Sequence, residues 1–164
     1  NLINNKSIVY LGALEPRKNI LFLLKVFKMI IQQDSSYTLT IIGDGPDKNK
    51  LVEFVSNNNL NVNFLGRLTH AEALLELPKH KIYLHTSIKE SFSYSLLEAK
   101  LSGLITCAYV MLQVPSDFID VAMTSFKENE WCDAILNINE IPEKFNGLNY
   151  TAEKMALKTL ELTQ

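Results

Sequence analysis

The sequence predicts a doubly wound α/β domain built on a parallel sheet. Short runs of β-branched and other apolar residues alternate along the chain with longer segments of helical periodicity. The short runs are apolar throughout rather than alternating with polar residues, which is typical of parallel strands buried on both faces. Parallel strands need crossover connections, so helices are expected on both sides of the sheet. Glycines also follow three of the expected strands, at the edge where such sheets bind ligands.

Six segments have the composition of strands. A helical segment follows each of the first four, and two follow the sixth. The expected strands are residues 7–12, 37–43, 62–66, 82–86, 105–109 and, more weakly, 121–126. The expected helices are residues 19–33, 47–58, 69–79, 92–102, 128–136 and 151–162. Thr69, with Glu72 three residues later, predicts a capping box, and Gly103 ends the helix after the fourth strand.

Composition limits the classes of partner. A formal charge of −2 and only two arginines, Arg17 and Arg67, give no basic surface, so no nucleic-acid partner is expected. Cys107 and Cys132 lack metal-ligand spacing and are interpreted as buried thiols of a reducing cytoplasm. No apolar run reaches the roughly 20 residues of a membrane span, and the first residues do not resemble a signal peptide. Because the chain does not begin with Met, we expect an excised domain.

The glycines at the strand ends are the first sign of a site. They are Gly12 after the first strand, Gly43 and Gly45 after the second, and Gly66 after the third. Glycine permits tight turns and a close approach of the backbone to a ligand. Any one of them is explained equally well as a simple turn, and it is the succession that favours a ligand site.

Residues 87–103 carry most of the chemistry. Glu90 falls in the loop after the fourth strand and Glu98 in the following helix. The N-terminus of that helix offers N–H groups and a positive dipole end, which favour a phosphate. A carboxylate accepts two hydrogen bonds from a vicinal diol. The combination fits a nucleotide sugar, although spacing alone leaves open that Glu90 is a solvated loop residue and Glu98 a surface helix residue.

Several motifs resemble those of retaining glycosyltransferase family 4. Residues 86–99, TSIKESFSYSLLEA, resemble its two-glutamate motif, Glu-Gly-Phe-Gly-Leu-x-x-x-Glu. YLG at 10–12 with PRKN at 16–19, IIGDGP at 41–46 and VNFLG at 62–66 are similar to its first three strand ends, in the same order. The resemblance covers roughly residues 7–106. It implies that residues 1–164 form the Rossmann-like, nucleotide-sugar-binding half of a GT-B fold, without the N-terminal acceptor domain.

The resemblance also implies a role for each matching residue. Glu98 would hold the ribose hydroxyls, Glu90 would contact the transferred sugar, and Lys18 would bind the diphosphate and stabilise the leaving group. Lys18 and Glu90 are therefore the expected catalytic residues. The expected substrate-binding residues are Glu98, the backbone N–H groups of Phe92, Ser93 and Tyr94, Gly12 and Arg17 on the phosphate side, and Gly66 and Arg67 near the base.

The implied reaction is retaining glycosyl transfer from a nucleotide-diphosphate sugar, with no metal and no cofactor. The resemblance places it in surface-polysaccharide or glycolipid synthesis, with an acceptor sugar or lipid-linked glycan. The expected location is cytoplasmic, including the inner face of the membrane, with any membrane contact made by the N-terminal half. We expect no transferase activity from the domain alone.

The sequence departs from the family pattern in two places. The arginine that usually follows the first strand's glycine is Ala13 here, with Arg17 as a nearby substitute. The usual Gly-Gly-x-Pro-Glu after the fifth strand is replaced by residues 112–117, LQVPSD. These departures keep open a non-catalytic, glycosyltransferase-like partner or nucleotide-binding subunit. A dinucleotide-dependent oxidoreductase is weaker, because the third glycine of that fingerprint is missing after Gly45.

The other polar or aromatic singletons are interpreted as structural. His85 is expected to pack at the end of the fourth strand, His70 and His80 to be solvated, and Trp131 to lie in the core.

Overall fold

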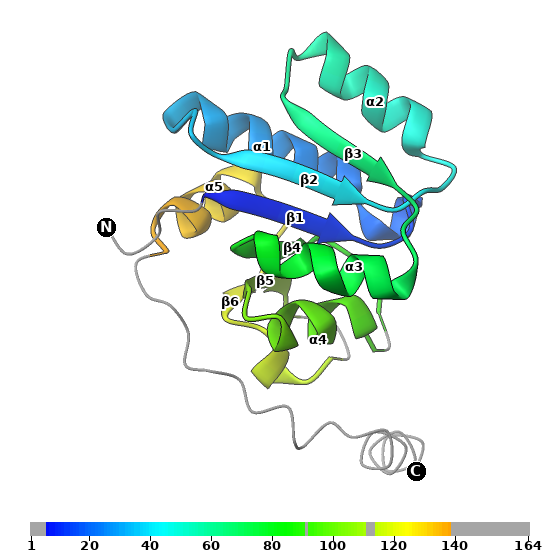
Figure 1. Ribbon diagram of the computed structural model, residues 1–164. Helices are drawn as coiled ribbons and strands as arrows, with labels where there is room; N and C mark the ends of the chain where they lie inside the picture. The colour runs from blue at the N-terminus through cyan, green and yellow to red at the C-terminus, as the bar shows by residue number, and fades with distance from the viewer. Residues whose placement is uncertain (1–5, 91, 111–113, 139–164) are drawn as a thin grey trace.

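The computed structural model describes residues 6–90, 92–110 and 114–138. Its centre is one six-stranded sheet in the order β3-β2-β1-β4-β5-β6, and every neighbouring pair of strands is parallel (Figure 1). The order reverses between β1 and β4, which is the switch point where doubly wound sheets bind ligands. The expected Rossmann-like, doubly wound α/β class is therefore confirmed.

Strands and helices alternate as the sequence predicts. The strands are β1 Ser7–Leu11, β2 Thr38–Ile42, β3 Val62–Gly66, β4 Ile82–His85, β5 Ile105–Tyr109 and β6 Val121–Met123. The α-helices are α1 Ile20–Gln33, α2 Lys48–Asn57, α3 His70–Glu76, α4 Tyr94–Leu101 and α5 Glu128–Leu136. Three short 3-10 turns join them, η1 Pro16–Lys18, η2 Leu77–Lys79 and η3 Ser116–Phe118.

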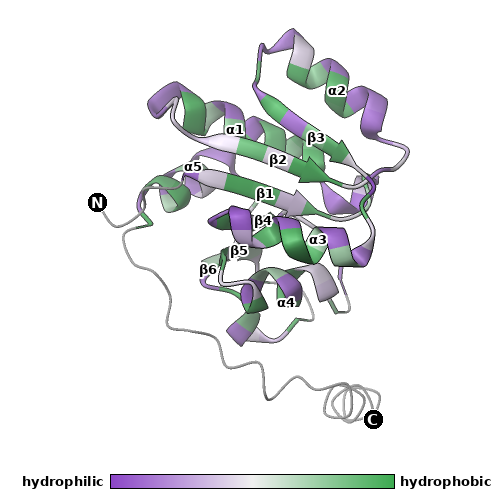
Figure 2. Ribbon diagram, viewed as in Figure 1, coloured by the Kyte–Doolittle hydropathy of each residue, from purple (hydrophilic) through white to green (hydrophobic). Residues whose placement is uncertain are grey.

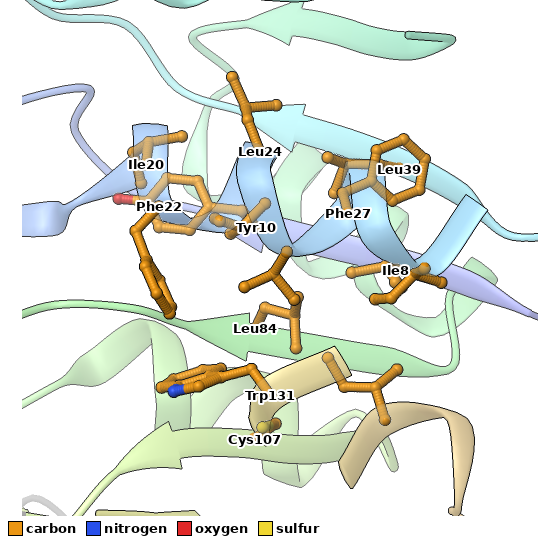
Figure 3. Close-up of a cluster of buried hydrophobic side chains, with 14 of the residues drawn as sticks. Ile8, Tyr10, Ile20, Phe22, Leu24, Phe27, Leu39, Leu84, Cys107 and Trp131 are labelled. Carbon is orange, nitrogen blue, oxygen red and sulfur yellow. The ribbon is translucent and has the colours of Figure 1, made fainter. Parts of the chain in front are cut away.

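Two apolar layers cover the two faces of the sheet. Ile8 and Tyr10 of β1 pack with α1, α2 and α5, and this layer contains the fully buried Trp131 (Figure 3). Val9, the residue between them, packs on the opposite face with α4 and η2. Figure 2 shows the apolar residues gathered along the middle of β1, with hydrophilic residues on α2. Because successive residues are buried on opposite faces, the strands contain consecutive apolar residues rather than an apolar–polar alternation.

Some element boundaries differ from the prediction. The helix expected at 69–79 ends as an α-helix at Glu76, because Pro78 has no N–H to donate to the preceding turn. The helix expected at 92–102 begins at Tyr94, because the Ser93 side chain caps it by accepting from the Leu96 N–H. The sixth strand ends at Met123 rather than at 126. The helix expected at 151–162 lies outside the described residues.

Other local predictions hold. Thr69 and Glu72 form the capping box in both directions. Cys107 and Cys132 are buried free thiols, as expected, and burial raises the pKa of Cys107. Among the described residues, no helix is long and apolar enough to cross a membrane.

Candidate functional site

The loops after β1 and β4 meet at the switch point of the sheet. These strands are neighbours, so their carboxyl ends bring η1 next to the segment that follows β4. Two hydrogen bonds join the loops: the Ile88 N–H donates to the Arg17 carbonyl at 2.9 Å, and the Thr86 hydroxyl donates to the Lys18 carbonyl at 2.9 Å. The main chain itself therefore sets Lys18 beside Glu90, although 72 residues separate them.

Glu90 lies at the centre of a charged cluster. Its Oε1 forms an ion pair with Lys18 Nζ and accepts from the Ser87 hydroxyl at 2.9 Å, while Oε2 lies 3.3 Å from Arg17 Nη1. The Glu90 side chain is only 6% exposed. Burial alone would raise the pKa of Glu90, but the hydrogen bond and charge of Lys18, helped by Ser87, lower it below its usual value. Glu90 is therefore an ionised carboxylate held by two cations.

The N-terminus of α4 lies next in the chain. Ser93 is buried and caps the helix, and the Leu97 N–H bonds to the Ser93 carbonyl at 3.2 Å. The N–H groups of Tyr94 and Ser95 are those that helix geometry leaves for an outside acceptor. The Tyr83 hydroxyl donates to the Leu11 carbonyl at 3.0 Å and contacts the Ser95 hydroxyl at 2.8 Å, which fixes this helix end against β1. A helix start with two N–H groups open to an outside acceptor thus follows Glu90 in the chain, an arrangement that suits an anion.

The three residues expected to offer N–H groups lie at the start of α4. Phe92 precedes the helix, and Ser93 is its N-cap rather than a helical residue, because the cap places the first helical residue at Tyr94. The Phe92 ring packs edge-on against Tyr94 and Phe118, with centroids 5.0 and 5.7 Å apart. Tyr94 is exposed beside this contact.

Glu98 lies in a different environment, one turn into α4. Its Oε1 is 2.9 Å from Nε2 of His70, the first residue of α3. The Glu98 side chain is 21% exposed and that of His70 is 72% exposed. The carboxylate is thus accessible from solvent and anchored on one oxygen.

A cleft of about 610 Å³ lies at the carboxyl ends of β1, β2 and β3. It is lined by the three loops, including Gly12, Ala13, Gly43 and Arg67. A Cβ on Gly43 would lie 1.8 Å from the Gly12 carbonyl oxygen, so these turns can pack only without side chains there. Gly66 has φ +70, a left-handed conformation that glycine adopts without strain. The succession of glycines therefore shapes a concave surface.

The sequence-predicted residues fall into three adjoining groups. Lys18, Arg17 and Glu90 are in direct contact; Gly12 and Arg67 line the cleft; Glu98 pairs with His70. Ala13 lines the cleft without a charge, and the cation in the cleft lining is Arg67. Arg17 pairs instead with Glu90 and with Glu15, which lies 2.7 Å from its Nη2. Residues 111–113, which include the start of the 112–117 segment that departs from the family pattern, lie outside the described part of the chain.

Three contributors were not predicted from the sequence. His70 is exposed as expected, but it also pairs with Glu98. His85 lies buried 3.7 Å from Glu90, and the Tyr83 hydroxyl joins β1 to α4. His80, expected to be solvated, is instead largely buried and bonded to the Ser7 hydroxyl at 2.6 Å. Within the described residues, no group of three or more His, Cys, Asp or Glu side chains could hold a metal ion.

The fold and the family comparison together define a class: the chain is a Rossmann-like glycosyltransferase domain of the GT-B type. The model of the family "Glycosyl transferases group 1" matches residues 3–150, and the chain belongs to that family.

Curated relatives support this assignment. The chain is 28% identical over 142 residues to poly(ribitol-phosphate) alpha-N-acetylglucosaminyltransferase of Staphylococcus aureus, covering 85% of this chain and 27% of the relative. It is 28% identical over 137 residues to the gpi3 subunit of phosphatidylinositol N-acetylglucosaminyltransferase of Schizosaccharomyces pombe, covering 80% of this chain and 30% of the relative. The chain therefore spans less than a third of the length of these relatives.

Solved structures show the same fold. A mutant of S. aureus TarM in complex with fondaparinux, alpha-GlcNAc-glycerol and UDP superposes with a TM-score of 0.82 at 24% identity, covering 96% of this chain and 35% of TarM. The pneumococcal O-GlcNAc transferase GtfA, in complex with UDP and GlcNAc, superposes with a TM-score of 0.69 at 22% identity, covering 79% of this chain and 27% of GtfA.

Proposed function

We propose that this chain binds a nucleotide-diphosphate sugar and supplies the donor half of a retaining glycosyl transfer. The observation that carries the proposal is the cluster at the switch point, where Lys18 and Arg17 surround Glu90 beside the start of α4. Positive charge and N–H groups suit the diphosphate, and carboxylates suit the hydroxyls on either side of it.

The donor is proposed to lie across the carboxyl ends of the strands. Glu98 accepts from the ribose hydroxyls, with Gly66 and Arg67 near the base, and Gly12 lies under the phosphates. Glu90 accepts from the transferred sugar. Lys18, Arg17 and the N–H groups at the start of α4 stabilise the negative charge that develops on the leaving diphosphate. This arrangement provides the charge stabilisation without calling on a metal or a cofactor.

The donor and pathway are proposed from the relatives. Both curated relatives described above are named as N-acetylglucosaminyltransferases, and the TarM and GtfA structures contain UDP. We take UDP-N-acetylglucosamine as the first donor to test. Acceptors of the same kinds, a surface polymer or a glycolipid, place the enzyme in polysaccharide or glycolipid synthesis at the cytoplasmic face of the membrane.

A second domain is proposed to supply the acceptor site. The chain spans only 27% and 30% of the curated relatives described above. A polypeptide of these 164 residues should therefore bind the donor and show no glycosyl transfer. Glycosyl transfer by this polypeptide alone would contradict the proposal that a second domain supplies the acceptor site.

A panel titration tests the proposed function. Isothermal calorimetry is run with UDP-, GDP- and ADP-sugars on the wild-type chain and on the Glu98→Ala variant. We expect one nucleotide class to bind to wild type and to bind at least about tenfold more weakly to the variant, because a hydrogen bond to a charged group contributes about 1.5–3 kcal/mol. Failure of every nucleotide sugar to bind would overturn the proposal.

One observation favours a second candidate, a non-catalytic glycosyltransferase-like partner. Ala13 brings no charge to the cleft where the family resemblance places an arginine. If the panel shows no binding, this candidate replaces the first. Binding that Arg17→Ala weakens would instead show that Arg17 supplies the second cation.

A further inference from the structure

His85 is a buried imidazole whose polar atoms are not satisfied. It ends β4 at the switch point, is 1% exposed, and lies nearly parallel to the Tyr83 ring, with centroids 6.0 Å apart. Within the described residues, neither of its ring nitrogens has a hydrogen-bond partner. A buried polar group left unpaired costs about 1–3 kcal/mol, so its presence calls for a reason other than stability.

The Glu90 carboxylate lies close to this imidazole. His85 Nε2 lies 3.7 Å from Glu90 Oε1, which is beyond hydrogen-bond distance and within a small side-chain movement of it. The same oxygen is occupied by Lys18 and by the Ser87 hydroxyl. While Lys18 holds the carboxylate, His85 has no access to it.

The charges around His85 keep it neutral in this arrangement. Burial lowers the pKa of His85 to about 4, the Lys18 charge acts in the same direction, and the Glu90 charge opposes both. Arg17 lies on the far oxygen of Glu90, and the hydroxyls of Tyr10 and Tyr83 are the titratable groups of the neighbouring strand and of β4 itself. A neutral imidazole still has one N–H to donate.

Donor binding would change which partners Glu90 has. Under the proposed function, on which this step rests, Lys18 and Arg17 turn to the diphosphate. Glu90 is then a largely buried carboxylate that has lost two cations, which is costly unless another donor replaces them. His85 is the imidazole already placed beside it.

We propose that His85 is a positioning residue for Glu90. When the diphosphate draws Lys18 and Arg17 away, the His85 N–H donates to Glu90 Oε1 and holds the carboxylate in place for the hydroxyls of the transferred sugar. The imidazole that is unpaired in the ligand-free protein thus becomes a hydrogen-bond donor to Glu90 when the nucleotide sugar binds.

A double-mutant cycle tests this role. The dissociation constant of UDP-N-acetylglucosamine is measured by calorimetry for wild type, His85→Leu, Glu90→Gln and the double variant. We expect His85→Leu to weaken binding about tenfold and to have no further effect in the Glu90→Gln background, since the imidazole acts through that carboxylate. An equal effect in both backgrounds, or no effect in either, would overturn the proposal.

Two further variants separate positioning from folding. His85→Gln keeps a neutral N–H donor and should bind within about threefold of wild type. His85→Leu should melt at or above the wild-type temperature, because it replaces an unpaired polar group with an apolar one. A His85→Leu chain that binds weakly because it unfolds would contradict the proposal.

His80→Leu is the matched control. It lies before the other end of the same strand, bonded to the Ser7 hydroxyl and far along β4 from Glu90. Its donor affinity should equal that of wild type. A wild-type chain that binds no donor would count against the proposed function itself, an outcome distinct from an unaltered affinity in His85→Leu.

Discussion

The two glutamates of the site are held in opposite ways. Glu90 is 6% exposed, and Lys18, Arg17 and Ser87 surround it. Glu98, 21% exposed, pairs with one histidine that is itself 72% exposed. Folding therefore completes the environment of Glu90 before any ligand arrives, whereas Glu98 remains accessible on one oxygen.

This difference separates the two ends of the proposed donor site. At Glu98, a ribose hydroxyl can add to a carboxylate that is already in place. At Glu90, Lys18 and Arg17 must first exchange their ion pairs with the carboxylate for contacts with the diphosphate. Preformed binding is thus expected at the nucleoside end and an exchange of ion-pair partners at the sugar end.

The largest difference should appear in folding stability. Glu90→Ala leaves Lys18 without its partner in a largely buried position, which should lower the free energy of unfolding by about 3 kcal/mol. Glu98→Ala removes an accessible carboxylate and should change it by no more than about 0.5 kcal/mol. Urea denaturation measures both. Equal losses in the two variants would remove the contrast between the two glutamates.

Lowering the pH should reduce the free energy of unfolding first through protonation of His85, which lies beside Glu90. The pKa of His85 is lowered from 6.5 to about 4, so the unfolded chain binds the proton more strongly. This term is absent above pH 6.5 and destabilises the fold as the pH falls toward 4, by about 2 kcal/mol between pH 7.5 and 5. Urea titrations at several pH values should show that His85→Leu loses this dependence.

Glu90 titrates in a lower window. Because its folded pKa is lowered, its stabilising contribution is present above the ordinary carboxyl range and is lost as the pH falls through the folded value.

A stability profile of His85→Leu that still declines between pH 7.5 and 5 by as much as wild type would contradict the assignment to His85.

Lys18 should contribute to nucleotide binding more than an exposed lysine. Lys18→Ala should weaken UDP binding about tenfold, because the diphosphate loses a charged hydrogen-bond donor. Lys25→Ala is the control: Lys25 belongs to α1 and pairs at 3.7 Å with Glu128 of α5. Calorimetry with UDP compares the two. Similar affinities in both variants would remove Lys18 from the phosphate site.

The smallest effect is expected at His70. His70→Ala removes an exposed hydrogen bond to Glu98 and should weaken UDP binding about threefold, equivalent to about 0.7 kcal/mol. The same calorimetric titration detects this change. A loss of UDP affinity of tenfold or more would mean that Glu98 depends on His70 as strongly as Glu90 depends on its cations, against the contrast between the two glutamates.

Much of the fold was predictable because burial on both faces leaves a direct pattern in the sequence. Strands β1 and β4 carry uninterrupted apolar runs at 8–11 and 82–84, and Thr69 with Glu72 specifies the start of α3. The boundaries that were wrong depend on single atoms. The helix after β4 begins late because Ser93 supplies the cap, and α3 ends early because Pro78 lacks an N–H.

Candidate site residues that stand in sequence motifs could be named from the sequence. Contacts between side chains of different elements could not. Glu90, Glu98 and Lys18 stand in motifs that can be followed along the chain. The His70–Glu98 pair joins residues that are 28 positions apart in the chain, and His85 lies 3.7 Å from Glu90 across the loop after β4. A histidine in an apolar strand looks like packing until its neighbours in space are known.

The most direct test is a comparison of two ligands by NMR on the isotope-labelled chain. We predict that UDP and UDP-N-acetylglucosamine, which share the diphosphate, both shift the amide resonances of Gly66, His70 and Glu98 and the side chain of His85, whereas only the sugar nucleotide adds shifts at Phe92. Amides at the opposite end of the sheet, such as that of His80, should remain unchanged with both ligands. Shifts confined to residues away from the strand ends, or identical shifts with UDP and UDP-N-acetylglucosamine, would contradict the assignment of Glu98 to the nucleoside and Glu90 to the sugar.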